Sequence, residues 1–181
     1  MKKTQLLLFI LFPLLTFGQN QKNTEMTHIL KNDLIEIHID LPLENYRLAR
    51  FDWTGKIALV KYKGIDVSGT EKLNAEHEND YGKGFYNEFG IDAPVGFDET
   101  KEGDWFHKIG IGLLKKEGEQ YDFSYAYEIE PAKFTVTDEP GKIIIELSAE
   151  KRNGYAYALK KEIELLESGF VIKYFLKNTG E

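Results

Sequence analysis

The chain has no cysteine among its 181 residues. Disulfides, thiolate zinc sites and thiol nucleophiles are therefore excluded, and the fold must be held together by packing alone. Positive charge is also scarce, because 23 Lys and Arg stand against 30 Asp and Glu, which gives a formal net charge of −7. Nucleic acids and anionic membranes require a basic protein face. The sequence therefore predicts neither of them as a partner.

Long hydrophobic runs are missing too, apart from one at the N-terminus. That run, Leu6 to Leu15, follows Lys2 and Lys3 and precedes the small residues around Gly18. Its length of about ten residues is half of what a membrane span needs, whereas this order of charge, apolar run and small residues is typical of a secretory signal peptide. We predict a signal peptide at residues 1–18, a periplasmic or secreted protein and no membrane association after cleavage, which would leave a charge of −9 because Lys2 and Lys3 are the only charged residues removed.

The remainder reads as one domain. Residues 19–32 are polar and aperiodic, which predicts a flexible leader, and residues 33–181 are numerous enough for one domain with a substantial core. Apolar residues alternate with polar ones in Ile35–Leu41, Ile143–Leu147 and Phe170–Leu176, as in half-buried strands. With turn residues such as Pro140-Gly141 between the strands, the pattern predicts an all-β, antiparallel β-sandwich.

Two segments need interpretation. Apolar side chains change parity between Tyr46 and Trp53, which predicts a strand with a β-bulge that forms a hairpin with Ile57–Tyr62. The segment 158–167 is rich in helix formers, but it continues the two-residue period of Tyr155 and Tyr157. We therefore expect a strand there as well.

Between Asp80 and Leu114 the alternation stops, and aromatic, acidic and glycine residues accumulate. A long irregular insertion in a compact domain is usually functional or disordered, and disordered segments are poor in aromatics. Aromatic rings stack on the C–H faces of sugars, and carboxylates bind hydroxyl groups. The sequence therefore predicts a carbohydrate site in this insertion, with Trp105 as the main stacking residue and Phe85 beside it. The predicted ligand-binding residues are Tyr86, Asn87, Glu88, Trp105 and His107.

Catalytic and metal-binding roles compete with plainer interpretations. His107 titrates near neutral pH and is a candidate for proton transfer, although a structural histidine at a strand entrance fits as well. Glu88 and the loop acids could form a carboxylate pair for glycoside chemistry, or could simply be solvated; these acids are Asp92, Asp98, Glu99, Glu102 and Asp104. Glu76, Glu78 and Asp80 could bind Ca²⁺, but a solvated charge run is the better interpretation. We predict no metal site and no cofactor.

The chain resembles the N-terminal half of the aldose 1-epimerase (galactose mutarotase-like) superfamily. The resemblance rests on four stretches: Leu48–Ile57, Tyr86–Gly90, Trp105–Leu113 and Tyr174–Gly180. It implies a β-supersandwich that binds carbohydrates, here in an incomplete form. The catalytic His and Glu of the family mostly follow the equivalent of the last strand, so no catalytic residue is transferred from the resemblance.

The last predicted strand, Phe170–Lys177, is followed by a turn without a further strand. We expect an open sheet edge there, only partly protected by Lys173 and Lys177, through which chains could associate. Three hypotheses follow for function. The first is an exported, aldose-epimerase-like carbohydrate-binding domain that is not catalytically complete on its own. The others are a non-enzymatic interaction module and a small polysaccharide-acting enzyme that uses loop carboxylates.

Overall fold

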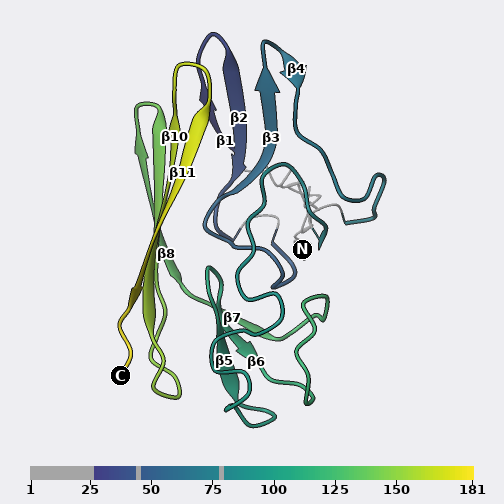
Figure 1. Cartoon of the computed structure of the whole chain (residues 1–181), viewed down its shortest axis with the longest axis vertical. Helices are drawn as coiled ribbons and strands as arrows, with labels where there is room; N and C mark the ends of the chain where they lie inside the picture. Colours follow the sequence, from purple (N-terminus) through teal and green to yellow (C-terminus); the bar gives the residue numbers. More distant parts are fainter. Residues whose placement is uncertain (1–26, 44–45, 78–79) are drawn as a thin grey trace, which may run out of the picture.

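The computed structural model describes residues 27–43, 46–77 and 80–181. Within these ranges the protein is all-β: eleven strands form three antiparallel sheets, and no α-helix is present (Figure 1). No helix in these ranges is long and apolar enough to cross a membrane. The all-β, antiparallel fold predicted from the sequence is confirmed. The predicted signal peptide lies outside the described residues.

Two four-stranded sheets form the sandwich. The N-terminal sheet has the order β1-β2-β3-β4 and consists of β1 (Thr27–Lys31), β2 (Ile35–Asp40), β3 (Lys56–Tyr62) and β4 (Ile65–Asp66). The C-terminal sheet has the order β11-β10-β9-β8 and consists of β8 (Lys133–Glu139), β9 (Lys142–Ser148), β10 (Tyr157–Leu165) and β11 (Phe170–Asn178). A small sheet, β5 (Trp105–Lys108), β6 (Gly112–Lys115) and β7 (Ile129–Pro131), lies at the end of the molecule opposite β4 (Figure 1).

Isoleucines from both large sheets form the main core. Ile37, Ile39 and Ile57 from one sheet pack with Ile145 and Ile163 from the other, and all five are fully buried. Most of them alternate with less buried residues, as follows from the two-residue period of a strand, which sends one parity to the core. The sequence pattern thus fixes which face of each sheet points inward.

A second core, made mostly of aromatic rings, supports the small sheet. Phe106 packs edge-on against Phe97, at 5.0 Å between ring centroids, and against Tyr127 at 5.8 Å. Trp53 and Ala49 belong to the same cluster. Two aromatic residues of the long insertion, Phe97 and Phe106, therefore help to build this core, because each ring contributes a large apolar surface.

The region 46–53 corrects one expectation, because it forms no strand. Its backbone donates to the long insertion instead, from Asp52 to Asn87 O (2.9 Å) and from Trp53 to Gly110 O (3.0 Å). Strand β3 pairs with β2 and β4 rather than with this region, and its register with β2 shifts between His38 and Ile39, where Ala58 of β3 is left without a partner residue. The predicted hairpin and its bulge were therefore wrong.

The predicted flexible leader, residues 19–32, also needs correction. Residues 19–26 lie outside the described residues, but Thr27–Lys31 form β1, which pairs along its full length with β2. Leu30 enters the isoleucine core, so pairing and burial order a segment whose own sequence is mostly polar. The segment 158–167 is a strand as expected, because Tyr157–Leu165 form β10.

Candidate functional site

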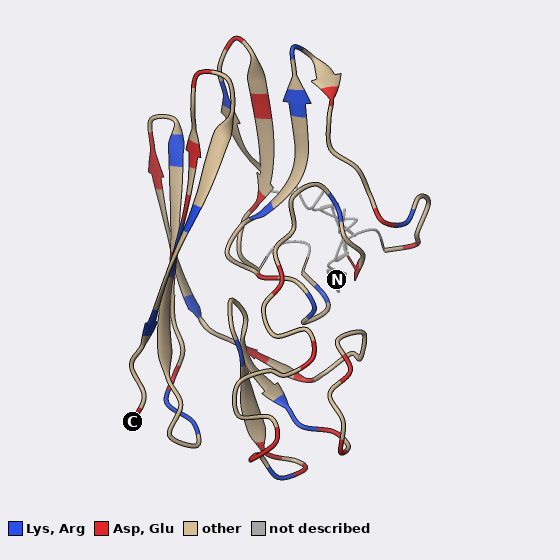
Figure 2. Cartoon of the chain, in the orientation of Figure 1, with Lys and Arg blue, Asp and Glu red and all other residues tan. Residues whose placement is uncertain are grey.

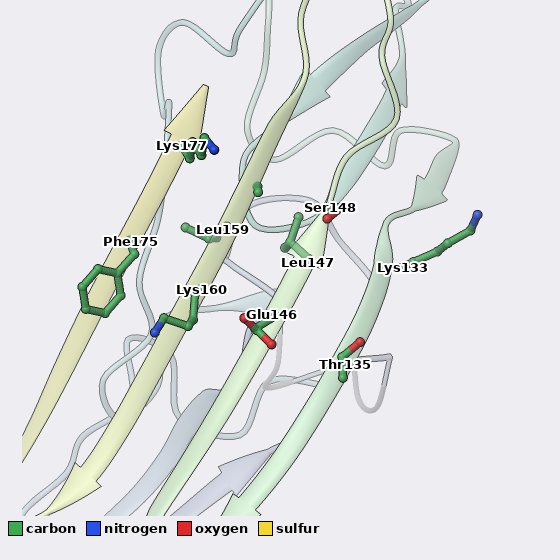
Figure 3. Close-up of a pocket in the computed structure, with 10 residues that line it drawn as sticks. Lys133, Thr135, Glu146, Leu147, Ser148, Leu159, Lys160, Phe175 and Lys177 are labelled. Atoms are coloured by element: carbon green, nitrogen blue, oxygen red, sulfur yellow. The ribbon is translucent and has the colours of Figure 1, made fainter. Parts of the chain in front are cut away.

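The outer face of the C-terminal sheet, which points away from the isoleucine core, carries a shallow groove of about 620 Å³ (Figure 3). All four strands of the sheet line it. Its outward-facing side chains are Lys133, Thr135, Glu146, Ser148, Ala158, Lys160, Phe175 and Lys177. The groove is therefore built on regular strands rather than on loops, and the two central strands, β9 and β10, are paired on both sides, so the backbone beneath it is rigid.

The groove exists because of the strand register. Cross-strand pairing sets two rows of outward side chains across the sheet, which are Thr135, Glu146, Lys160 and Phe175, and then Lys133, Ser148, Ala158 and Lys177. The two small residues, Ser148 and Ala158, are direct neighbours on the central strands. The surface sinks there, between longer side chains on the outer strands. With neighbouring strands about 4.8 Å apart, the groove extends about 14 Å across the sheet.

Phe175 supplies an aromatic surface at one border of the groove. Its side chain is 50% exposed, although it lies in the middle of a regular strand. The Lys160 ammonium lies 4.5 Å from the ring centroid, which is within cation–π range. Figure 3 shows the ring on β11, Lys160 next to it on β10, and Glu146 one strand further on β9. The groove thus combines one apolar ring with adjacent hydrogen-bonding groups.

The charges in and around the groove are mixed. Lys160 also donates to Glu162 at 2.7 Å, and this hydrogen bond lowers the pKa of the Glu162 carboxyl. Lys133 lies 3.4 Å from Glu150. Because these lysines already have carboxylate neighbours, the groove does not have the strong single-sign field that a polyanion site needs. It offers many donors and acceptors instead.

A second, mainly apolar cavity of about 410 Å³ lies on the inner side of the same sheet. It is lined by Val95 from the long insertion, Ile109, residues 155–157, and Leu176 and Asn178 from β11. The Tyr155 ring lies so close to Gly96 that a Cβ atom added to Gly96 would be 3.0 Å from the ring. This cavity adjoins the end of β11, where Leu176 is 50% exposed.

His107 and Trp105 line neither of these two cavities. His107 is only 1% exposed, lies edge-on to Tyr157, and has Nε2 3.0 Å from Tyr155 O. Burial lowers the pKa of its imidazole. Trp105 is partly buried at the start of β5, and Asn153 donates to its carbonyl oxygen at 3.2 Å. In this structure the His107 side chain and the Trp105 backbone both connect the small sheet to residues 153–157.

The three consecutive residues Tyr86, Asn87 and Glu88 point to different partners. The Tyr86 ring packs edge-on against Phe51 at 5.3 Å. Asn87 Oδ1 lies 2.9 Å from the Tyr174 hydroxyl oxygen, and Glu88 Oε2 lies 3.5 Å from Arg50 Nε. The structure therefore does not gather the predicted ligand-binding residues around one cavity.

Asn87 belongs to a buried polar centre that we did not predict. In the middle of this centre, Lys161 Nζ and Asp52 Oδ2 form an ion pair at 3.2 Å, and both side chains are at most 1% exposed. The Tyr174 hydroxyl donates to the same carboxylate at 2.6 Å, and Thr54 donates to it from its backbone N–H and its hydroxyl. Burial lowers the pKa of Lys161, while the charge of Asp52 counteracts this effect. The sequence contains one indication of this centre, because Lys161 interrupts the series of apolar inward-facing residues Tyr157, Leu159 and Ile163.

The remaining acidic candidates lie apart from the groove. All five loop acids named with Glu88 are exposed. Glu78 lies outside the described residues, and Asp80 is 3.8 Å from Arg47. Among the residues that the structure describes, no group of three or more His, Cys, Asp or Glu side chains could hold a metal ion.

No protein-family model, no curated protein and no solved structure matches this chain.

Proposed function

We propose that this protein is a carbohydrate-binding domain and that the outer groove of its C-terminal sheet holds the sugar. The observation that carries the proposal is the row across the groove, in which the exposed ring of Phe175 is followed by Lys160, Glu146 and Thr135 on successive strands. A sugar ring offers a C–H face for stacking and hydroxyl groups for hydrogen bonds. This row offers the matching aromatic face, one cation, one carboxylate and one hydroxyl.

Rigid support strengthens the proposal. Sites with few, well-placed polar groups bind best when those groups are held before the ligand arrives. In the groove the polar side chains stand on strands that are paired on both sides, β9 and β10, and on their direct neighbours. An extent of about 14 Å across the sheet suits a short oligosaccharide better than a single sugar ring.

Binding fits this groove better than catalysis. Glycoside cleavage usually requires two carboxyl groups about 5–9.5 Å apart. Of the described residues that line the groove, Glu146 alone carries a carboxylate. Glu88 and His107, the candidates from the sequence, lie elsewhere. We therefore propose a binding domain without a complete catalytic site of its own.

The proposal retains two expectations from the sequence. One is export to the periplasm or the cell exterior, based on the predicted signal peptide; N-terminal sequencing of the exported protein tests it, and a retained Met1 would contradict it. The other is kinship with the galactose mutarotase-like superfamily. An antiparallel sandwich agrees with that kinship, but many unrelated proteins share this architecture. The groove, and not the fold, therefore supports the function.

The test is titration calorimetry of the mature protein with a panel of neutral and acidic oligosaccharides. For a sugar that binds, Phe175→Ala should weaken binding about tenfold, as expected for a lost stacking contact. Because Phe175 is half exposed, its removal should leave the fold intact, which circular dichroism would verify. Trp105→Ala is the matched aromatic control and should leave the affinity unchanged. If Trp105→Ala weakened binding and Phe175→Ala did not, the sugar site would lie in the long insertion instead. If no sugar bound to the protein, the proposed function would be refuted.

A further inference from the structure

We propose that the open edge of β11 binds an extended polypeptide segment by strand addition. The segment would place an apolar side chain in the adjoining inner cavity and acidic side chains beside Lys173 and Lys177. This inference concerns the edge of the sheet, which shares Lys177 with the groove, and it does not depend on carbohydrate binding. It rests on the backbone of β11, on the inner cavity and on the charges of the strand.

The backbone of β11 is free on one side. The strand has nine residues, pairs with β10 without interruption, and pairs with no other strand in the described part of the chain. Thr179 N–H donates to Ala156 O, so these two residues form a hydrogen-bonded pair in the same register. Because such pairs alternate in an antiparallel ladder, Lys173 and Phe175 bond to β10. Ile172, Tyr174 and Leu176 therefore direct their N–H and C=O groups to the open side.

The cavity gives this edge a means of selecting a partner. Leu176 and Asn178 line the 410 Å³ cavity from the inner face of β11. Leu176 is 50% exposed there. In strand addition, main-chain hydrogen bonds supply affinity, and pockets for alternate side chains supply specificity. A strand added beside β11 would have its inward side chains next to Leu176, where an apolar residue can enter the cavity.

The charges indicate the chemistry of the partner. On the outer face of β11, Lys173 and Lys177 are both exposed. Lys173 lies 2.9 Å from Glu164 of β10, a pair in which both side chains are exposed. Opposite charges on adjacent strands attract, and like charges repel. An acidic segment therefore fits, whereas a second copy of β11 would bring four lysines onto one face.

The other edge of this sheet is protected. Strand β8 also pairs on one side only, but Asp138 lies on its inner-facing parity, and Glu139 follows it. Figure 2 shows this end of β8 in red. An inward-pointing charge is a common device against edge pairing. Between Ile172 and Leu176, the inner-facing residues of β11 carry no charge, so β11 is the edge suited to a partner strand.

The probes are capped nine-residue peptides, one alternating valine with glutamate and one alternating valine with lysine. In fluorescence anisotropy the glutamate peptide should bind, and the lysine peptide should bind about tenfold more weakly, because two charge pairs change sign. Hydrogen exchange should show protection of the amides of Ile172, Tyr174 and Leu176. A glutamate peptide that is N-methylated at alternate residues should not bind. Equal binding of both charged peptides, or protection at β8 instead, would overturn the proposal.

Two sets of variants separate the edge from other causes. Leu176→Pro removes an N–H from the open side while leaving the ladder to β10 intact, and proline is tolerated on edge strands in this position. It should abolish peptide binding. Val136→Pro, at the equivalent open position of β8, should not. If Leu176→Pro fails to fold, the double variant K173E/K177E still tests the idea, because it should reverse the preference toward the lysine peptide. A concentration-dependent dimer that Leu176→Pro abolishes would show that a second copy is the partner and would refute the acidic segment.

Discussion

Replacing Lys161 by methionine should destabilise the protein strongly, although the two side chains have similar length and apolar character. The substitution leaves the Asp52 carboxylate fully buried without its cation. Removing one partner of a buried ion pair usually costs about 3–5 kcal/mol. We expect the lower end, about 3 kcal/mol, because Tyr174 and Thr54 still donate to the carboxylate. A domain of this size has a total stability of about 5–15 kcal/mol.

Urea unfolding at pH 7, followed by tryptophan fluorescence, measures this change. A loss of 3 kcal/mol would also lower the melting temperature by about 6–12 °C. Lys160→Met is the matched control, because Lys160 directly precedes Lys161 in β10 but lies on the outer face. It should have a much smaller effect on the free energy of unfolding, since exposed ion pairs contribute little.

The double variant D52N/K161M provides the decisive comparison. It removes both charges, so it should be more stable than K161M alone, as has been found for other buried pairs whose charges are replaced together. A loss of less than about 1 kcal/mol for K161M would show that the Asp52 charge is not held in the buried state we describe. A double variant that is less stable than K161M would also contradict a buried Asp52 charge that depends on Lys161.

Two pH-dependent effects follow from other buried bases. Burial lowers the pKa of His107, so below about pH 6.5 the unfolded chain binds a proton that the folded protein does not, and the free energy of unfolding should fall with decreasing pH. His107→Leu should flatten this dependence in urea unfolding, and an unchanged slope would contradict the assignment. Burial lowers the pKa of Lys108 to about 8, so stability should rise from pH 8 to about 9.5, where only the unfolded chain keeps the proton. Lys108→Met should remove only part of this rise in stability, because burial also lowers the pKa of Lys56 to about 8. A rise of unchanged size in the variant would refute the argument.

The sequence predicts a strand well when all of its inward-facing side chains enter the same core. In β9, for example, Ile143, Ile145 and Leu147 point to the inside, and the residues between them point to solvent. The period is then visible without knowledge of the partner strands. The same rule extends to β10, where Lys161 occupies an inward position. A charged residue on an apolar parity therefore indicates a buried polar centre even before a structure is known, although the partner, 109 residues away, is not visible.

The region 46–53 could not be predicted, because its side chains enter different environments. Trp53 joins the aromatic core, and Asp52 enters the polar centre. Phe51 packs against Tyr86. Buried side chains on both parities read as a bulged strand in sequence. Only the contacts with the long insertion, which are tertiary, show that the segment is irregular. The same holds for β1, whose strand character comes from pairing with β2 rather than from its own pattern.

The candidate site was missed for a related reason. In sequence, Ser148 and Ala158 are ordinary outward-facing residues of two strands, and Phe175 is an isolated aromatic on a third. They form a groove only because the register aligns them, and register depends on every turn between β8 and β11. The aromatic residues of the long insertion gave a stronger signal, but several of them pack inside the protein: Phe97 and Phe106 belong to the second core, and Phe89 packs edge-on against Tyr174. An aromatic-rich segment thus indicates where a fold needs apolar volume as readily as where a ligand binds.

Strand β11 also shows why two functions can be tested separately on this sheet. Phe175 points outward into the groove, and Leu176 points inward to the second cavity, so neighbouring residues serve opposite faces. Phe175 donates and accepts its backbone hydrogen bonds toward β10, whereas the backbone of Leu176 faces the open edge. Truncating the ring therefore removes an outer contact without changing the edge, and a proline at 176 changes the edge without touching the ring. The alternation of a single strand thus separates the residues that test the two proposals, Phe175 and Leu176, although Lys177 borders both surfaces.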